Sequence, residues 1–125
     1  MSEQILLINA VKDDSDIAAA LFFKGKDSLF GRYWGSRVDQ QFLHFETCYY
    51  QGQEYAIENG IQVFDSGAQG EHKIQRGFAP VYTYSNHWLV NEEFSRAVEN
   101  FLKEEKSDVK EYKKQAEKLL PFKKE

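Results

Sequence analysis

The densest group of potentially catalytic side chains lies near the middle of the chain, directly after a short apolar run. Glu71, His72, Lys73 and Arg76 bring a carboxylate, an imidazole, an ammonium and a guanidinium into one short stretch. Glycines at 67, 70 and 77 allow positive φ values and a close approach of a ligand to the backbone. Carboxylates and imidazoles act as general bases, and cations hold anions. The stretch therefore predicts acid–base chemistry beside an anionic ligand, with Glu71 or His72 as the base.

A structural explanation of the same residues stays open. Glu71 and His72 could cap a short helix while Lys73 and Arg76 are solvated, because glycine-rich turns with nearby charges are common.

Two further groups of residues are candidates for ligand binding. Arg32 and Trp34 either line a ligand cleft or form an exposed arginine that covers buried aromatic rings. His44 and Glu46 lie near the start of a predicted helix, where the helix dipole favours an anion. His44 could equally be a capping or a core histidine. His87, next to Trp88, is either a ligand contact or the end of a strand packed under a helix.

Other familiar chemistries are missing from the sequence. The three histidines, at 44, 72 and 87, have no cysteine cluster beside them, so no metal site is predicted. Cys48 lies in an apolar helical pattern, which is a poor place for a nucleophile. Neither a phosphate-binding loop, a dinucleotide fingerprint nor a serine nucleophile elbow occurs.

Composition limits the class of protein further. The 125 residues predict one domain, and the aromatic content of 15% predicts a packed interior. The net charge of -4 argues against a protein that coats nucleic acid. A single cysteine excludes an intramolecular disulfide and fits a reducing, cytoplasmic setting. The chain has no run of ~20 apolar residues and no signal peptide at Met1–Gln4, so we expect a soluble protein.

Hydrophobic patterning predicts an α+β fold with a mixed sheet. Apolar runs at Ile5–Val11, Ile17–Phe23 and Leu29–Trp34, separated by turn residues, predict a three-stranded antiparallel meander. The run of alanines at 18–20 indicates that another element packs closely over the second strand. Helical spacing predicts a mostly buried helix over Phe42–Asn59, with apolar residues on two sides. Gly52 should pack closely against the sheet, and Gly60 should end the helix.

The second half of the chain predicts two more strands and a long helix. Ile61–Asp65 should form a fourth strand, reached by a right-handed crossover and parallel in part. The alternating, β-branched and aromatic residues of Pro80–Ser85 predict a fifth strand. Asn91 is the expected N-cap of a final helix whose apolar stripe continues to Pro121.

Several blocks of residues occur together in an order that resembles a known family. They are Phe30–Gly35, Leu43–Gln51, Gly67–Lys73 with Arg76–Phe78, and Pro80–Val81 and Thr83–Ser85 with His87–Trp88. These blocks look like the signature motifs of the bacterial FemAB-like predicted N-acyltransferases, also described as peptidoglycan biosynthesis/recognition proteins. The resemblance covers nearly the whole chain.

The resemblance implies a fold similar to that of acyl-CoA N-acyltransferases, of which this chain looks like the C-terminal unit. It implies an acyl-CoA or aminoacyl carrier as donor, and an anionic or cell-wall-precursor substrate. The matched motifs also add Gln69 and Tyr84 to the candidate substrate-binding residues. Two features depart from the pattern. Residues Ser36–Phe42 contain no glycine for a pyrophosphate-binding turn, and the helix after the fourth strand is cut down to about Glu71–Arg76.

Two functional hypotheses follow from these observations. The first is an N-acyltransferase in which Glu71 or His72 is the base, while Lys73, Arg76 and Arg32 attract the anionic carrier or precursor. The second is a non-catalytic binding or assembly module of the same fold, which would pair with a second copy or a partner through an exposed sheet edge.

Overall fold

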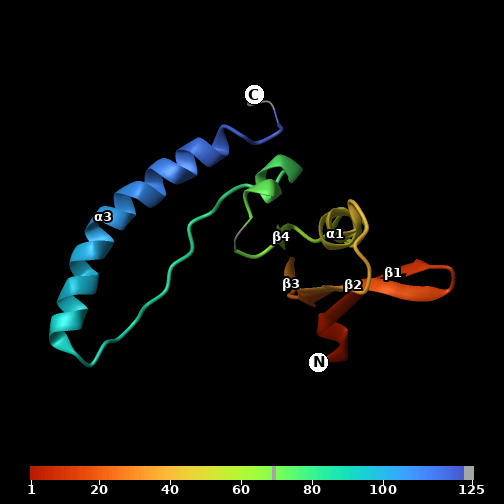
Figure 1. Cartoon of the computed structure of the whole chain (residues 1–125), viewed down its shortest axis with the longest axis horizontal. Helices are drawn as coiled ribbons and strands as arrows, with labels where there is room; N and C mark the ends of the chain where they lie inside the picture. The colour runs from red at the N-terminus through yellow and green to blue at the C-terminus, as the bar shows by residue number, and fades with distance from the viewer. Residues whose placement is uncertain (69, 123–125) are drawn as a thin grey trace. The chain divides into compact units, whose positions relative to one another are not determined.

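The chain forms two compact units, one from Met1 to Gly70 and the other from Glu71 onward. The structure is a computed structural model that describes residues 1–68 and 70–122. The first unit contains a sheet and the helical segment that follows it in the chain, and the second contains the long helix α3 (Figure 1).

The sheet of the first unit has four strands in the order β1-β2-β3-β4. Strands β1 (Ile5–Lys12), β2 (Ser15–Lys24) and β3 (Ser28–Ser36) pair antiparallel, and β4 (Val63–Asp65) pairs parallel with β3. The predicted α+β class, the meander and the parallel fourth strand are therefore confirmed. A 3-10 turn, η1 (Ser2–Gln4), precedes β1.

A bulge in β3 decides which of its side chains face the core. Leu21 pairs with Tyr33 while Phe22 pairs with Gly31, so Arg32 is an extra residue in β3. One extra residue reverses the alternation of faces along a strand. Trp34 consequently lies on the core side, next to the buried Ala20, and Tyr33 lies on the opposite face.

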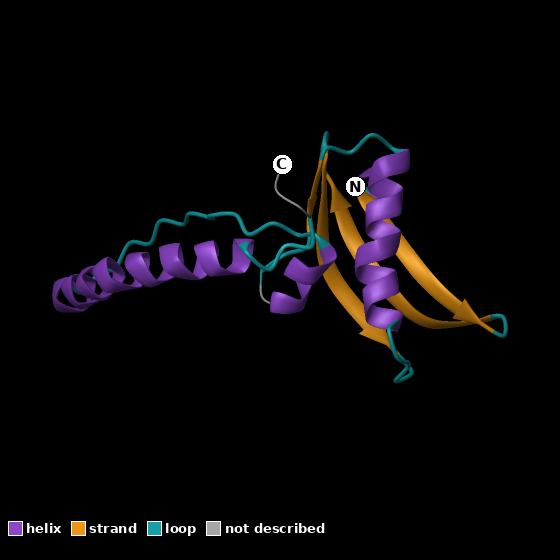
Figure 2. Ribbon diagram, turned by 90° about the horizontal axis from the view of Figure 1, so that it is seen from above, coloured by secondary structure: helices purple, strands orange, loops and turns teal. Residues whose placement is uncertain are grey.

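One continuous helical segment covers one face of the sheet (Figure 2). It consists of α1 (Leu43–Phe45), a π-helical stretch η2 (Glu46–Tyr50) and α2 (Gln51–Glu58). Phe22 and Leu29 of the sheet are fully buried in the core, at 1% and 0% exposure.

Gly52 explains how closely the helix can approach the sheet. A Cβ atom at this position would lie 2.7 Å from the Phe64 ring and 3.3 Å from the Phe22 ring. Only a residue without a side chain fits there, which confirms the predicted close packing.

The predicted end of this helix is also confirmed. Gly60 has a φ of 65°. The amide N–H of Gly60 donates to the Ile57 carbonyl, and that of Ile61 donates to the Ala56 carbonyl at 2.8 Å. This is the Schellman arrangement, in which a left-handed residue satisfies the last carbonyls of a helix.

The prediction that apolar residues on both sides of this helix would be buried is wrong. Tyr49 and Ala56 are buried against the sheet, whereas Tyr50 and Ile57 on the other side are exposed, Ile57 at 81%. Sequence periodicity reports where apolar residues recur, but it does not show whether a second layer exists to cover them.

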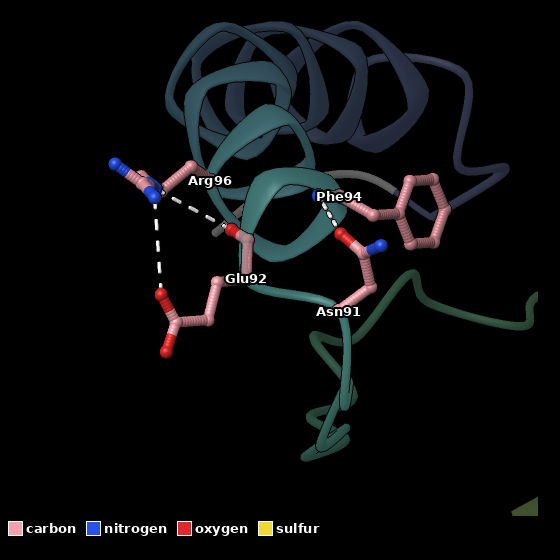
Figure 3. A network of polar contacts seen from close by, with 4 residues as sticks. All are labelled: Asn91, Glu92, Phe94 and Arg96. Atoms are coloured by element: carbon pink, nitrogen blue, oxygen red, sulfur yellow. Dashed lines mark hydrogen bonds and ion pairs between the residues drawn. The ribbon is translucent and has the colours of Figure 1, made fainter.

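The second unit consists of a short 3-10 helix, η3 (Glu71–Arg76), an irregular segment, and α3 (Glu92–Glu117). Ile74 of η3 and Ala116 of α3 are buried. Asn91 is the N-cap, as predicted, because its side-chain oxygen accepts a hydrogen bond from the Phe94 amide at 2.9 Å (Figure 3). Among the described residues, no helix is long and apolar enough to cross a membrane.

The predicted fifth strand at Pro80–Ser85 is wrong. These residues are irregular and mostly exposed, and Tyr84 is 91% exposed. Alternating β-branched and aromatic residues favour a strand only where a neighbouring strand supplies hydrogen bonds and a packed face. The predicted continuation of a helical stripe to Pro121 is also too long, because α3 ends at Glu117.

Candidate functional site

The candidate catalytic residues lie together on η3, and glycines in the left-handed region flank this helix. Gly67, Gly70 and Gly77 have φ values of 81°, 95° and 88°. Side chains three residues apart lie above one another in a 3-10 helix, so Lys73 and Arg76 share one edge of it. The short helix matches the shortened helix that the family resemblance implied, and the glycines adopt the positive φ values that the sequence allowed them.

The Arg76 guanidinium folds back along η3. Its Nη1 atom donates a hydrogen bond to the His72 carbonyl oxygen at 2.7 Å. Burial, with contributions from the Arg76 and Lys73 charges, lowers the pKa of His72 below its ordinary value of 6.5. The His72 imidazole is therefore mainly neutral at pH 7, which is the state of a proton acceptor.

Glu71 has a partner on α3 that sequence reasoning missed. The Tyr112 hydroxyl donates to the Glu71 Oε1 atom at 3.2 Å. Partial desolvation and the Glu71 carboxylate raise the pKa of the Tyr112 hydroxyl, so this phenol stays protonated. The sequence gives no signal for this contact, because 41 positions separate Tyr112 from Glu71 and no local pattern links the two.

The first unit contains a separate aromatic cluster, made of Trp34, His44, Phe45 and Tyr49. The His44 ring lies 5.2 Å from the Trp34 ring and 5.3 Å from the Tyr49 ring, between centroids. The Phe45 and Tyr49 rings are stacked at 6.2 Å. Of these residues, sequence analysis selected Trp34 and His44 and missed the other two as site residues.

The π-helical stretch explains why His44 and Tyr49 meet. Tyr49 lies in the π-helical stretch and His44 in α1 directly before it, and the wider turn of a π-helix, in which hydrogen bonds join residues five apart, lets the two side chains approach each other. Ordinary α-helical spacing separates positions five apart, so α-helical periodicity gave no signal for this contact. The resulting geometry is that of a histidine packed among aromatic rings.

Arg32 and Glu46 lie apart from this cluster. The Arg32 guanidinium lies over the Tyr33 ring, 4.9 Å from its centroid, and Arg32 is exposed. Because the bulge turns Tyr33 away from the helix and Trp34 toward it, the Arg32 guanidinium over Tyr33 and the Trp34 ring lie on different faces of the sheet. The exposed Glu46 carboxylate accepts a hydrogen bond from the Gln51 side chain at 2.8 Å.

The remaining candidates lie in or near the irregular segment. The His87 ring is hydrogen-bonded to the Ser85 hydroxyl at 2.9 Å, and Tyr84 extends into solvent. The exposed His87 is not packed under a helix, contrary to one of the two explanations offered for it. Gln69 lies outside the described residues.

Of the candidate groups, the one formed by Glu71, His72, Lys73 and Arg76 on η3 with Tyr112 on α3 is best suited to chemistry. A neutral imidazole, a carboxylate held by a phenol, and two cations lie on one helix and its neighbour. Such a group can accept a proton and attract an anion. Among the described residues, no three histidine, cysteine, aspartate or glutamate side chains form a group that could hold a metal ion.

Comparison with known proteins identifies the family. A model of the FemAB-like family, described as peptidoglycan biosynthesis/recognition, matches residues 1–124. A search of curated proteins and a search of solved structures returned no match. The chain belongs to the FemAB-like family, as the resemblance of its motifs indicated.

Proposed function

We propose that this FemAB-like chain takes part in transfer of an acyl or aminoacyl group to an amine on a cell-wall precursor, with His72 as the general base. Membership of a peptidoglycan biosynthesis/recognition family supports the class of substrate. The observation that supports the role of His72 is the lowering of its pKa by burial and by its two cationic neighbours.

A base with a lowered pKa suits this reaction. The amine attacks the carbonyl carbon of the donor, a C–N bond forms, and the bond to the carrier's sulfur or oxygen breaks. The nitrogen must lose a proton, which His72 accepts and then passes to the departing carrier, so no net proton stays on the protein. Glu71, held by Tyr112, would orient the amine.

The carrier would be held differently from the way a glycine-rich turn holds a pyrophosphate. Residues 36–42 contain no glycine, and Phe42, with a φ of 65°, brings a bulky side chain to the start of α1. The loop before the helix therefore does not fit a pyrophosphate. The positive charges of Lys73 and Arg76 on η3 are the groups that would attract an anionic carrier, with acyl-CoA as one such carrier.

The test compares two substitutions on η3. We expect His72→Gln to lower the rate of thiol release from acetyl-CoA, in the presence of a muramyl peptide with a free amine, by about 10²-fold or more. Gln75→Ala is the matched control, because Gln75 is an exposed residue of the same helix outside the candidate group and should leave the rate unchanged. An aminoacyl ester replaces acetyl-CoA in a parallel assay.

The pH profile provides an independent readout. The rate should rise with pH as the His72 imidazole loses its proton, and the midpoint should lie below pH 6.5, because the pKa of this group is lowered. His72→Gln should abolish that rise. Equal rates for the wild type and His72→Gln at every pH, with both donors, would contradict the proposal.

A second candidate function is a binding module of the same fold without catalysis. The exposed apolar residues of the sheet favour it, because they offer a surface that packing within the first unit does not cover. Isothermal titration with acetyl-CoA distinguishes the two functions: binding that Lys73→Ala with Arg76→Ala removes supports the transferase, and no heat supports the module.

A further inference from the structure

The C-terminal part of α3 and the turn that follows it contact η3, the helix that carries the proposed base and the two cations. All of these residues belong to the second unit. At the start of η3, the Tyr112 hydroxyl donates to the Glu71 Oε1 atom at 3.2 Å. At its end, the Phe122 ring lies so close to Gly77 that a Cβ atom there would be 2.8 Å from it. The two ends of η3 are therefore joined to the same region.

The helical rises of the two elements explain why these contacts follow one another. Three residues of a 3-10 helix advance about 6 Å, and four residues of an α-helix advance about 6 Å as well. One such step from the Glu71–Tyr112 pair leads to Ile74 and Ala116, which are the buried residues of η3 and α3 among those described. The next step along η3 leads to Gly77, opposite a point that lies beyond the end of α3. A contact there needs a side chain from the turn after the helix.

That turn brings Phe122 to Gly77. The Leu119 amide donates to the Ala116 carbonyl at 3.0 Å, which closes the end of α3. Pro121 lacks the amide hydrogen that a further helical turn would need, so the helix does not continue past it. Phe122 follows directly, and its ring contacts the backbone at Gly77, which has a φ of 88° and no side chain to keep the ring away.

The same contacts decide which edge of η3 carries the cations. Residues three apart lie above one another in a 3-10 helix, so positions 71, 74 and 77 follow one edge and Lys73 and Arg76 share another. The Gly77 amide donates to the Ile74 carbonyl at 3.0 Å, and Arg76 donates to the His72 carbonyl at 2.7 Å. The shape of the last turn of η3 therefore sets where the Arg76 guanidinium lies.

We propose that Phe122 is a positioning residue: its ring holds the last turn of η3 against the end of α3 and thereby sets the place where Arg76 binds the anionic carrier. The inference rests on the proposed function for the nature of the anion, whereas the position of Arg76 beside His72 can be measured without any reaction. Without the ring, the backbone freedom of Gly77 lets the last turn of η3 open.

The first experiment follows the His72 imidazole of the full chain by NMR titration. The pKa of His72 lies below 6.5 because of burial and the charges of Arg76 and Lys73. Phe122→Ala should move this pKa upward, toward 6.5, since the Arg76 charge then lies beside the imidazole for less of the time. Phe122→Tyr keeps the ring and should retain the wild-type value. Phe101→Ala is the matched control, because this ring lies about 16 Å along α3 from Tyr112 and should leave the titration unchanged.

A double-mutant cycle tests whether the ring acts through Gly77. Gly77→Ala places a methyl group against the Phe122 ring and also strains a backbone in the left-handed region. Only the first effect needs the ring, so Gly77→Ala should move the His72 pKa less in the Phe122→Ala background than in the wild type. Equal changes in the two backgrounds would contradict an action of the ring through this contact. Circular dichroism checks that all variants keep the helix content of the wild type.

Kinetics connect this position with the proposed function. At pH 8, where His72 is neutral, Phe122→Ala should raise KM for acetyl-CoA about threefold or more and change kcat by about twofold at most, because a cation and not the base is displaced. A His72 titration that is the same in the wild type and Phe122→Ala would overturn the positioning role, whether or not the chain transfers acyl groups. A wild type that transfers no group from either donor would count against the proposed function alone, since the titration decides the role of Phe122 independently.

Discussion

The helical segment of the first unit and the helix α3 of the second unit are held in different ways. The segment from Leu43 to Glu58 lies against a sheet, and Gly52, Tyr49 and Ala56 on its inner side are buried. In α3, which is longer, Ala116 is the buried residue among those described, and apolar side chains such as Phe94 and Phe101 are exposed.

Interactions between residues close in sequence contribute more to the stability of α3 than to that of the helical segment in the first unit. Its N-cap hydrogen bond, the acidic residues Glu92 and Glu93 in its first turn, and side-chain pairs such as Lys113 with Glu117 all act within a few residues. The Arg96–Glu92 pair belongs to the same class (Figure 3). Substitutions should therefore lower stability most where packing over the sheet decides the position of the helix, and least where only local pairs do.

The largest effect should come from the core of the first unit. Phe22→Ala should lower the free energy of unfolding by about 3–5 kcal/mol, because a fully buried ring is replaced by a cavity. Hydrogen exchange of the β2 amides measures this change. Phe94→Ala on α3 is the matched control, and it should alter exchange in β2 very little, since Phe94 is 59% exposed. Equal effects of the two substitutions would remove the contrast between the units.

A smaller effect is expected at the helix–sheet contact. In Gly52→Ala the new methyl group meets the Phe64 ring, and such overpacking costs about 1–3 kcal/mol. Alanine gains ~1 kcal/mol over glycine in a helix, so we expect a net loss of up to about 2 kcal/mol in the free energy of unfolding. Urea denaturation measures the free energy of unfolding of the wild type and of each variant. Gly35→Ala provides the control, since a Cβ atom there meets nothing within 4 Å. A stabilised Gly52→Ala protein would show that the contact can relax.

In α3, removal of the N-cap should have the clearest effect. Asn91→Ala should destabilise the helix by about 1 kcal/mol, because the Phe94 amide loses its acceptor. Helical circular dichroism during thermal unfolding reports the loss. Asn100→Ala changes the same residue type inside the helix and should not destabilise it, as alanine has the higher helix propensity. If the two substitutions gave the same result, the cap would contribute nothing.

The smallest effect belongs to the exposed ion pair of α3. Arg96→Gln should change the free energy of unfolding by about 0.5 kcal/mol or less, because the charges are 3.9 Å apart and both side chains are exposed. Thermal unfolding at low and high salt measures it. A change above 1 kcal/mol that salt does not reduce would mean that Arg96 packs against another part of the protein.

Much of the first unit could be predicted from its sequence. Turn residues and apolar runs located the meander, and the glycines at 52 and 60 located the close contact and the end of the helix. These are local signals. The prediction of a fifth strand was wrong because its pattern is also local. A strand needs a neighbouring strand to pair with, and the pattern does not specify one.

Parts of the candidate site could also be predicted. The family resemblance implied a short helix at about Glu71–Arg76, and the flanking glycines indicated where the chain takes positive φ values. The contact of Tyr112 with Glu71 depends on how α3 meets η3, and that of His44 with Tyr49 depends on a π-helical stretch. Neither long-range packing nor a local change of helix type leaves a periodic signal in the sequence.

The sequence by itself determined the family, the order of the sheet strands and the positions where glycine permits turns, because these depend on residue type and spacing along the chain. Tertiary structure alone decided that a bulge at Arg32 turns Trp34 toward the helical segment and Tyr33 toward the opposite face of the sheet. The physical reason is that the register of pairing between strands decides on which face of the sheet a side chain lies, and the sequence of a single strand does not encode that register.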